Sequence, residues 1–258
     1  MFFTKFFQSI LNVIAGLGNA LLFLSGTLRV ILRGRVRMGE VLHQIYEQGL
    51  QSVVIVALTS FASGVVLGLQ GHVVLARFGA KEFIAPLVAL SLVRELSPVF
   101  TALIFSGKAG ARITAELGTM NVNEQILATR TMGVDPIEFF VVPRMLACFL
   151  VLPILTIISE AVGIAGGYFV SVFEAHLPGT FYMNQTFKAI RYVDFFGGFT
   201  KVFFFAILVS WICCYQGFFT KGGSLGVGQY TTKAVAYCYI FVILSSALLT
   251  KIVLMFWG

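Results

Sequence analysis

Arg94 and Glu95 stand side by side at the middle of an apolar stretch, residues 84–106, that is long enough to cross a bilayer. A charge at the centre of a membrane helix costs roughly 2.5–3.5 kcal/mol on insertion scales, which makes such a residue a functional candidate by default. Neighbouring helix residues point about 100° apart, so the two side chains cannot simply neutralise each other along their own helix. Each charge therefore needs another partner, in the protein interior or in a wet cavity.

Other charged residues lie in or near apolar stretches: Glu160, Lys201 and Lys251. If the stretches pack as a bundle, we expect Glu160 to pair with Arg94 and Lys201 to pair with Glu95. Lys201 has an alternative, because a lysine near the end of a span can extend its ammonium group to the lipid headgroups. We interpret Lys251 as an interface anchor.

The composition is that of an integral membrane protein. Hydrophobic residues make up 58% of the chain and charged residues 11%, against about 25% charged residues in soluble proteins. The net charge of +7 comes from basic residues that flank apolar stretches, as membrane topology selects, so we expect no nucleic acid partner. The four cysteines lie in apolar stretches without metal-ligand spacing, and we interpret them as small hydrophobic residues.

The segment around Gly107 and Lys108 superficially resembles a phosphate-binding loop. Ala102 replaces the first glycine of that motif, and Ala109 stands where Ser or Thr would bind magnesium. The chain also lacks the motifs of common hydrolases and metalloenzymes. We therefore expect a chain that is not an enzyme, with no catalytic residue, no metal site and no cofactor of its own.

Five apolar stretches are each long enough to form a transmembrane helix. They cover residues 50–69, 84–106, 139–171, 197–218 and 234–257. The third exceeds one bilayer crossing, so it either tilts or protrudes as a helix on the outer face. The predicted fold class is an all-α integral membrane protein with one domain, residues 1–258, whose five-span bundle occupies residues 50–257.

Residues 1–40 have a different pattern, because polar and small residues recur at spacings of three and four and so share one helical face. These residues are Lys5, Gln8, Asn12, Gly16 and Asn19. The pattern predicts an amphipathic helix in the membrane interface, followed by a basic segment that contacts an anionic leaflet. A signal peptide is the alternative, but the apolar run is interrupted and lacks a small-residue cleavage site.

Lys and Arg are concentrated in the N-terminal segment and in alternate connections between the spans. By the positive-inside rule, this asymmetry predicts a cytoplasmic N-terminus and, after five spans, a periplasmic C-terminus. The longest inner connection, residues 107–138, predicts a short helix that is capped by Asn123, carries Glu124 in its first turn and Arg130 in its last, and ends at Gly133. This helix is either a solvated connector or a docking site for a partner protein.

Several segments occur in the order and spacing of the MlaE/YrbE permease family, which the chain resembles over nearly its whole length. They are Gly68–Gly71 (GLQG), residues 87–99 (LVALSLVRELSPV), residues 106–120 (SGKAGARITAELGTM), Glu124-Gln125, residues 133–136 (GVDP) and Pro143-Arg144. The resemblance implies the permease subunit of an ABC transporter that moves phospholipids between inner and outer membranes and maintains outer-membrane lipid asymmetry.

The resemblance also implies partners. It implies a homodimer in the bacterial inner membrane, with two copies of a separate cytoplasmic ATPase gripping the 107–138 connection and holding ATP and Mg. A STAS-domain protein would sit on the ATPase, and a ring of MCE-domain proteins would sit over the outer face. The implied substrate is a phospholipid.

Site residues follow from the same resemblance, motif by motif. The 107–138 connection resembles the family's coupling helix, and its candidate ATPase contacts are Glu116, Glu124, Gln125 and Arg130. Arg94 and Glu95 match the family's charged pair near the lipid cavity. The candidate lipid-path residues are Leu67, Gln70, Val74, Leu75, Phe78, Arg94, Glu95 and Lys201.

Two other functions stay open. An ion- or proton-coupled secondary transporter would use Arg94, Glu95 and Glu160 as a relay and often shows internal repeats, and the sequence has no convincing repeat. A non-transporting membrane scaffold would merely recruit cytoplasmic proteins through the 107–138 connection. It would carry no bound lipid and would tolerate changes at the charged pair.

Overall fold

The computed structural model describes residues 2–34 and 36–257, and of residues 2–15, 17, 254, 256 and 257 it describes only the backbone. The described part is helical, without a strand. Its five segments long and apolar enough to cross a membrane are Met38–Arg77, Lys81–Val122, Ile137–Phe173, Tyr192–Phe218 and Gly223–Val253. The predicted five-span all-α fold is confirmed, and each span extends beyond its predicted boundary at one or both ends.

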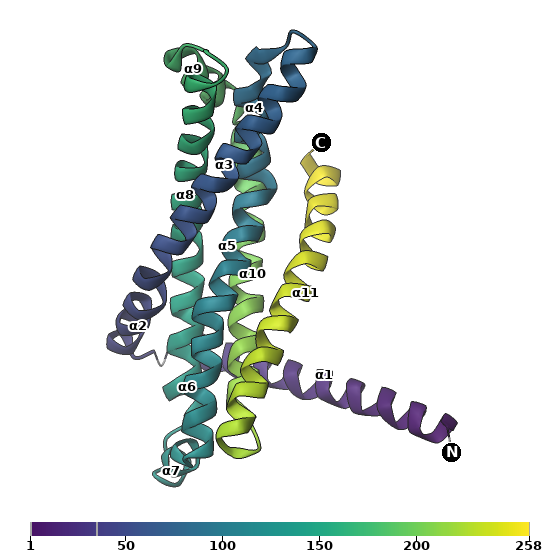
Figure 1. Cartoon of the computed structure of the whole chain (residues 1–258). Coiled ribbons are helices and arrows are strands. Elements are labelled where there is room, and N and C mark those ends of the chain that lie inside the picture. The colour runs from purple at the N-terminus through teal and green to yellow at the C-terminus, as the bar shows by residue number, and fades with distance from the viewer. Residues whose placement is uncertain (1, 35, 258) are drawn as a thin grey trace.

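Figure 1 shows the spans side by side, with α1 (Phe2–Leu32) crossing one end of the bundle. The spans contain α2 (Met38–Ile45) and α3 (Gln51–Arg77), then α4 (Ile84–Ser91), α5 (Ser97–Phe105) and α6 (Ala111–Val122), then α8 (Val142–Phe173), α10 (Tyr192–Phe218) and α11 (Gly223–Trp257). The short helices are α7 (Gln125–Thr131), α9 (Gly179–Ala189) and the 3₁₀ turn Lys81–Phe83. One-turn π segments at Tyr46–Leu50, Leu92–Leu96 and Ser106–Gly110 join helices within spans, and a fourth at Ile137–Val141 begins the third span before α8.

α8 is the central helix of the bundle, and 67% of its most apolar stretch is buried. It packs closely against α3 because both helices present small residues at the contact. A Cβ added to Gly64 would lie 1.9 Å from the carbonyl oxygen of Gly163, and the hydroxyl groups of Ser60 and Ser159 are 2.7 Å apart. Small residues at a contact let two helix backbones approach closely.

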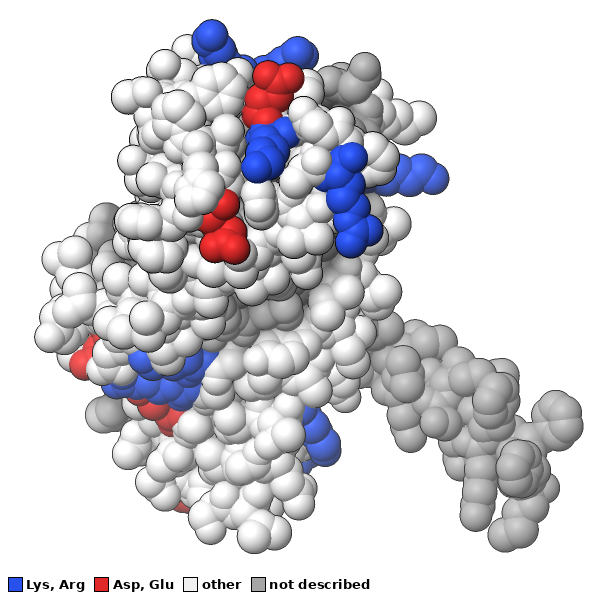
Figure 2. Space-filling model, turned by 45° about the horizontal axis from the view of Figure 1, so that its top comes forward, with Lys and Arg blue, Asp and Glu red and all other residues white. Residues whose placement is uncertain are grey.

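α11 contrasts with α8, since only 17% of its most apolar stretch is buried. It packs against α10 and α6 and leans away from the other spans toward its C-terminal end (Figure 1). Figure 2 shows a largely uncharged surface on the face in view, with the charged side chains confined to a few groups. Such a surface suits a lipid surrounding.

α1 lies across the bundle rather than along it, as expected for an interfacial helix (Figure 1). The predicted polar residues Lys5, Gln8 and Asn12 lie outside the described side chains. The C-terminal half of α1 is anchored to the bundle. Phe23 is buried, and the indole Nε1 of Trp211 donates a hydrogen bond to the carbonyl oxygen of Ala20 at 2.9 Å.

α9 was not expected, because its residues lie in the predicted connection between the third and fourth spans. It folds against α8 through Tyr182, which is fully buried and donates a hydrogen bond from its hydroxyl to the carbonyl oxygen of Ile164 at 3.3 Å. Burial raises the pKa of Tyr182 to about 12. Gly167 leaves room for this phenol, since an added Cβ would lie 2.6 Å from its oxygen.

Candidate functional site

Arg94 and Glu95 lie in the π segment Leu92–Leu96 that joins α4 to α5. A π turn loosens the regular hydrogen-bond ladder of a helix and recurs at functional sites. Here the carbonyl oxygen of Arg94 accepts a hydrogen bond from Lys201 Nζ of α10 at 2.9 Å. The backbone and both charged side chains of this turn therefore face polar groups of neighbouring helices.

The Lys201 ammonium group is fully engaged. Its Nζ lies 2.5 Å from Glu95 Oε1 and donates to Thr250 Oγ1 of α11 at 2.8 Å, in addition to the carbonyl oxygen of Arg94. These contacts use all three ammonium protons, and the lysine side chain is 3% exposed. The expected Lys201–Glu95 pair is confirmed, and extension of Lys201 to the headgroups is wrong.

Arg94 pairs with Asp194, and the predicted pair with Glu160 is wrong. The guanidinium group contacts Asp194 Oδ1 through Nη2 at 2.6 Å and through Nε at 2.7 Å. Asp194 Oδ2 also accepts the backbone N–H of Arg191 at 3.1 Å, in a capping box at the start of α10. Asp194 and Lys201 are two helical turns apart, so one face of α10 presents an acid and a base to the two charges of the π turn.

The sequence analysis missed Asp194 because it placed the start of the fourth span at residue 197, which left this residue in a loop. The signal was present: an acidic residue three positions after Arg191 opens a long apolar run, as expected in the first turn of a helix. We call Arg94, Glu95, Asp194, Lys201 and Thr250 the Arg94 cluster.

Glu160 lies on α8 with only 6% of the residue exposed. Its Oε1 atom has no hydrogen-bond partner among the described residues. The relay of Arg94, Glu95 and Glu160 that a secondary transporter would need is therefore not connected by hydrogen bonds in the described part of the chain.

The Arg94 cluster lines a cavity of about 560 Å³. α4, the π turn, α10 and α11 contribute its walls, and its lining also includes Leu90, Ser91, Arg191, Val193, Gly197, Gly198 and Val253. The Arg94 side chain is 48% exposed, although Asp194 is 6% exposed. A guanidinium group has five N–H donors in a planar fork, so Arg94 keeps donors that face the cavity and can bind an anion.

The candidate lipid-path residues of α3 divide between two faces. Leu67 and Leu75 pack against a buried cluster that includes Ile84 and Val88. The others, Gln70, Val74 and Phe78, are exposed at intervals of four residues along the helix. None of these α3 residues lines the Arg94 cavity, so the structure does not bring the two groups together within one chain.

A second set of charges joins the π segment Tyr46–Leu50, α6 and α8 near the other end of the bundle. Arg112 of α6 pairs with Glu47 and, at 2.7 Å, with Glu116 Oε1. Arg144 of α8 contacts Glu116 Oε2 at 3.1 Å and has a side chain only 7% exposed. Lys108 donates to the carbonyl oxygen of Gln51. We call Glu47, Arg112, Glu116 and Arg144 the Arg112 cluster, which places the candidate ATPase contact Glu116 within internal ion pairs.

The predicted short helix in the 107–138 connection exists as α7, but it is built differently from the prediction. α6 continues to Val122, and Asn123 ends α6 instead of capping α7. Glu124 occupies the N-cap position of α7 in a left-handed conformation, without a side-chain capping bond. The predicted end is confirmed, since Gly133 has a φ of 79° and donates its N–H to the carbonyl oxygen of Arg130 at 3.1 Å.

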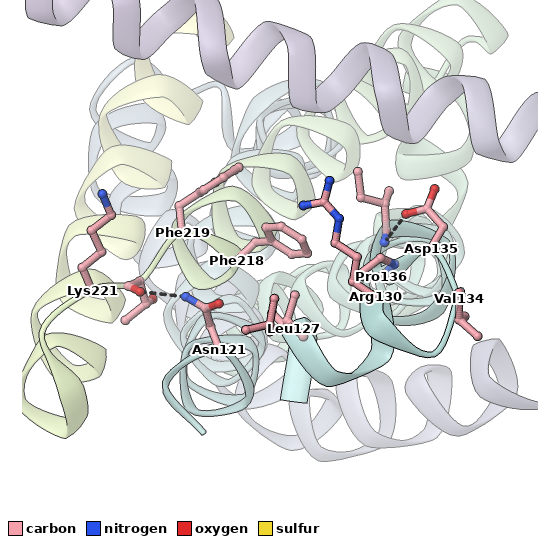
Figure 3. Close-up of a pocket in the computed structure, with 13 residues that line it drawn as sticks. Asn121, Leu127, Arg130, Val134, Asp135, Pro136, Phe218, Phe219 and Lys221 are labelled. Atoms are coloured by element: carbon pink, nitrogen blue, oxygen red, sulfur yellow. Dashed lines mark hydrogen bonds between the residues drawn. The ribbon is translucent and has the colours of Figure 1, made fainter. Parts of the chain in front are cut away.

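α7 is held in place by buried residues and exposes a polar face. Ile126 and Thr129 are each 7% exposed, whereas the predicted contacts Glu124, Gln125 and Arg130 are all exposed. Beside them lies a cavity of about 760 Å³, the α7 cavity, which Figure 3 shows between α7 and the junction of α10 with α11. Its lining includes Asn121, Leu127, Arg130, Asp135, Phe218, Phe219 and Lys221.

The described residues contain no group of three His, Cys, Asp or Glu side chains that could hold a metal ion. All four cysteines are buried and free, as small hydrophobic residues would be.

Known proteins resemble this chain over most of its length. The model of the permease MlaE family matches residues 41–252. The chain is 37% identical over 246 residues to the intermembrane phospholipid transport system permease protein MlaE of Haemophilus influenzae, covering 95% of this chain and 94% of the relative. It is 37% identical to probable ABC transporter permease proteins of Rickettsia typhi, over 86% of both chains, and of Synechocystis, over 93% of this chain and 90% of the relative. The chain belongs to the MlaE family of ABC transporter permeases.

Proposed function

We propose that this chain is the permease subunit of an ABC transporter that moves phospholipids between the inner and outer membranes of a bacterium and maintains outer-membrane lipid asymmetry. The observation that carries the proposal is the cavity of the Arg94 cluster, where a guanidinium group 48% exposed lies within an apolar bundle. A phospholipid needs such a site, because its phosphate is anionic and its tails are apolar. The name of the Haemophilus relative supports the same substrate class.

In this proposal, Arg94 binds the headgroup phosphate. Asp194 holds the guanidinium plane through two nitrogens, so the remaining N–H groups are already oriented before the lipid arrives. Lys201 neutralises Glu95, which would otherwise repel the phosphate. The exposed residues Val74 and Phe78 of α3 would contact acyl chains in the assembled transporter.

We further propose a homodimer. α11 contributes Thr250 and Val253 to the cavity but is the least buried span. The face of α11 that points away from the cavity is therefore largely uncovered by other helices of the same chain. A second copy against α11 would enclose a lipid between two Arg94 clusters. The dimer would then move lipid by widening and narrowing the space between the copies.

The energy would come from a separate cytoplasmic ATPase dimer that binds ATP and Mg and contacts α7 through Glu124, Gln125 and Arg130. The N-terminus would then be cytoplasmic and the C-terminus periplasmic, with a STAS-domain protein on the ATPase and an MCE-domain ring over the opposite face. The second span connects the sites, because Arg94 and Arg112 are 18 residues apart on it, which is about 27 Å of helix. A movement of α7, which follows the C-terminal end of α6, would be transmitted to the Arg94 cluster through this span.

Mild purification of the tagged chain from its native membrane tests the proposal, with mass spectrometry of the proteins and lipids that accompany it. We expect an ATPase and phospholipid in the same sample. A chain that carries lipid but no ATPase would favour a gradient-driven carrier, and a chain that carries neither would favour a scaffold.

A charge-reversal variant makes the test specific to α7. Arg130→Glu should lose most of the co-purified ATPase, because the change inverts the charge of the exposed face and touches no buried anchor. Lys188→Glu on exposed α9 is the matched control and should retain the ATPase. Equal recovery with both variants would contradict the assignment of α7 as the ATPase contact.

A further inference from the structure

A groove of about 590 Å³ lies between α1 and the end of α10 where it turns into α11. α1 contributes Leu22 and Phe23, α10 contributes Tyr215 and Phe218, and the turn contributes Lys221. The groove shares Phe218, Phe219, Ile137 and Lys221 with the α7 cavity, so the two spaces adjoin. Neither the charged clusters nor the ATPase contacts proposed above include its lining residues.

The groove lies at one end of the bundle, because Phe218 is the last residue of α10, a span of 27 residues. A helix of this length covers about 40 Å, which exceeds the roughly 30 Å hydrocarbon core of a bilayer, so its ends reach the headgroup layers. The groove therefore opens at the depth of lipid headgroups, where α1 crosses the bundle (Figure 1).

The floor of the groove is aromatic and partly uncovered. The ring centroid of Phe23 lies 5.7 Å from that of Tyr215, 5.5 Å from Phe218 and 5.8 Å from Phe219. Phe219 is still 43% exposed and Leu22 is 70% exposed. An apolar floor that remains open at headgroup depth fits an acyl chain lying against the protein.

The rim of the groove carries a cation and no acidic residue among its lining. Lys221 is exposed and forms no salt bridge among the described residues. Asn19, Gln216 and Tyr230 add neutral polar groups, and no Asp or Glu belongs to the lining. A second cation stands close by, since Lys233 Nζ lies 5.3 Å from the ring centroid of Tyr230.

We propose that this groove binds one phospholipid with an anionic headgroup, with its phosphate on Lys221 and an acyl chain along the aromatic floor. This lipid is a structural ligand, distinct from the lipid of the Arg94 cavity. It bridges α1 to the α10–α11 turn, and that turn is joined to α6 by the hydrogen bond from Asn121 Nδ2 to the carbonyl oxygen of Thr220 at 2.8 Å (Figure 3). Anionic lipid would thereby fix α1 beside the helix that leads to α7.

Photo-crosslinking tests the site in the purified full-length permease, reconstituted in nanodiscs with a phosphatidylglycerol that carries a diazirine in its acyl chain. Mass spectrometry should map the cross-links to residues 18–24 of α1 and to Phe218 and Phe219. Lys221→Glu should lower the yield at these positions about tenfold, because a charge-assisted contact becomes a repulsion. Lys188→Glu on α9 is the matched control and should leave the yield unchanged.

Two comparisons distinguish the occupant. An equivalent phosphatidylcholine probe should cross-link less than phosphatidylglycerol, and millimolar glycerol phosphate should not compete, because it lacks the acyl chain. Cross-links spread evenly along the spans, or equal yields in Lys221→Glu and Lys188→Glu, would overturn the proposal. Competition by glycerol phosphate would show that the groove binds a soluble anion instead of a lipid. Lys221→Gln serves as a second variant, and unchanged thermal unfolding would show that either loss is local.

Discussion

The Arg94 cluster and the Arg112 cluster are each centred on an arginine of the second span, yet they face different surroundings. Arg94 is held on one side by Asp194 and is open on the other to a cavity of about 560 Å³. Arg112 is held between Glu47 and Glu116, and Glu116 also neutralises the buried Arg144. The first arrangement leaves N–H donors of Arg94 available to a ligand. In the second arrangement the charges pair with one another and join three spans.

The role of an intramembrane charge therefore has to be assigned from its surroundings other than its ion-pair partner. Both clusters satisfy their charges, so pairing alone does not separate a binding site from a brace. The cavity beside Arg94 does separate them. We therefore expect changes in the Arg94 cluster to alter lipid binding and changes in the Arg112 cluster to alter the transmission of movement from α7.

The largest loss of stability is expected for Lys201→Met. The change leaves the Glu95 carboxylate without its cation and removes donors from Thr250 and from the carbonyl oxygen of Arg94. Removing one partner of a buried pair costs about 3 kcal/mol at the low end, which applies here because Glu95 stays partly exposed. Thermal unfolding in detergent measures the loss.

The double variant Lys201→Met with Glu95→Gln should recover part of this stability, since no unpaired charge remains. Lys188→Met is the exposed control. If Lys201→Met unfolds at the temperature of the control, Lys201 is not the centre of the cluster.

A smaller loss is expected for Glu116→Gln, at about 2 kcal/mol, because Arg112 keeps Glu47 while Arg144 loses the one carboxylate that it contacts among the described residues. Lipid bound to the purified permease should stay at the wild-type amount, whereas ATP-driven lipid transfer by the assembled transporter should fall. Glu82→Gln, on an exposed turn, is the control. Normal transfer with reduced bound lipid would reverse the roles of the two clusters.

Thr250→Val should cost about 1 kcal/mol, because valine keeps the shape of threonine and loses the hydroxyl contacts with Lys201 and Glu95. Equilibrium unfolding resolves a change of this size only against a matched change on the same helix. Thr232→Val provides it, since Thr232 is exposed on α11 and its hydroxyl bonds only to its own helix. A loss of unfolding free energy equal to that of Thr232→Val would show that α11 is not part of the Arg94 cluster.

Span number, fold class and the pairing of Lys201 with Glu95 were predictable from sequence, because apolar length and isolated charges are local signals. The partner of Arg94 was not found, because the first turn of α10 lies outside the apolar run by which its start was predicted. A helix boundary that moves by five residues turns Asp194 from a loop acid into an intramembrane ligand of Arg94.

Three further features needed three dimensions. α9 is stabilised by burial of Tyr182 against α8, a contact that its own weakly apolar sequence does not indicate. Glu124 enters α7 in a left-handed conformation, which is uncommon for residues with a side chain and carries no sequence signature. The groove under α1 depends on where Phe23 meets the end of α10, almost 200 positions later in the chain.

The most direct test of the account is the amount of phospholipid that stays bound to Arg94→Gln in the gently purified permease, compared with wild type and with Arg77→Gln at the exposed end of α3. Arg94→Gln leaves the Asp194 carboxylate, which is 6% exposed, without its cation, so we expect this variant to unfold at a lower temperature. Adding Asp194→Asn removes the unpaired charge and should restore part of the stability. We predict several-fold less bound phospholipid in both the single and the double variant. Wild-type lipid content in both variants would contradict the account and make the Arg94 cluster a brace like the Arg112 cluster.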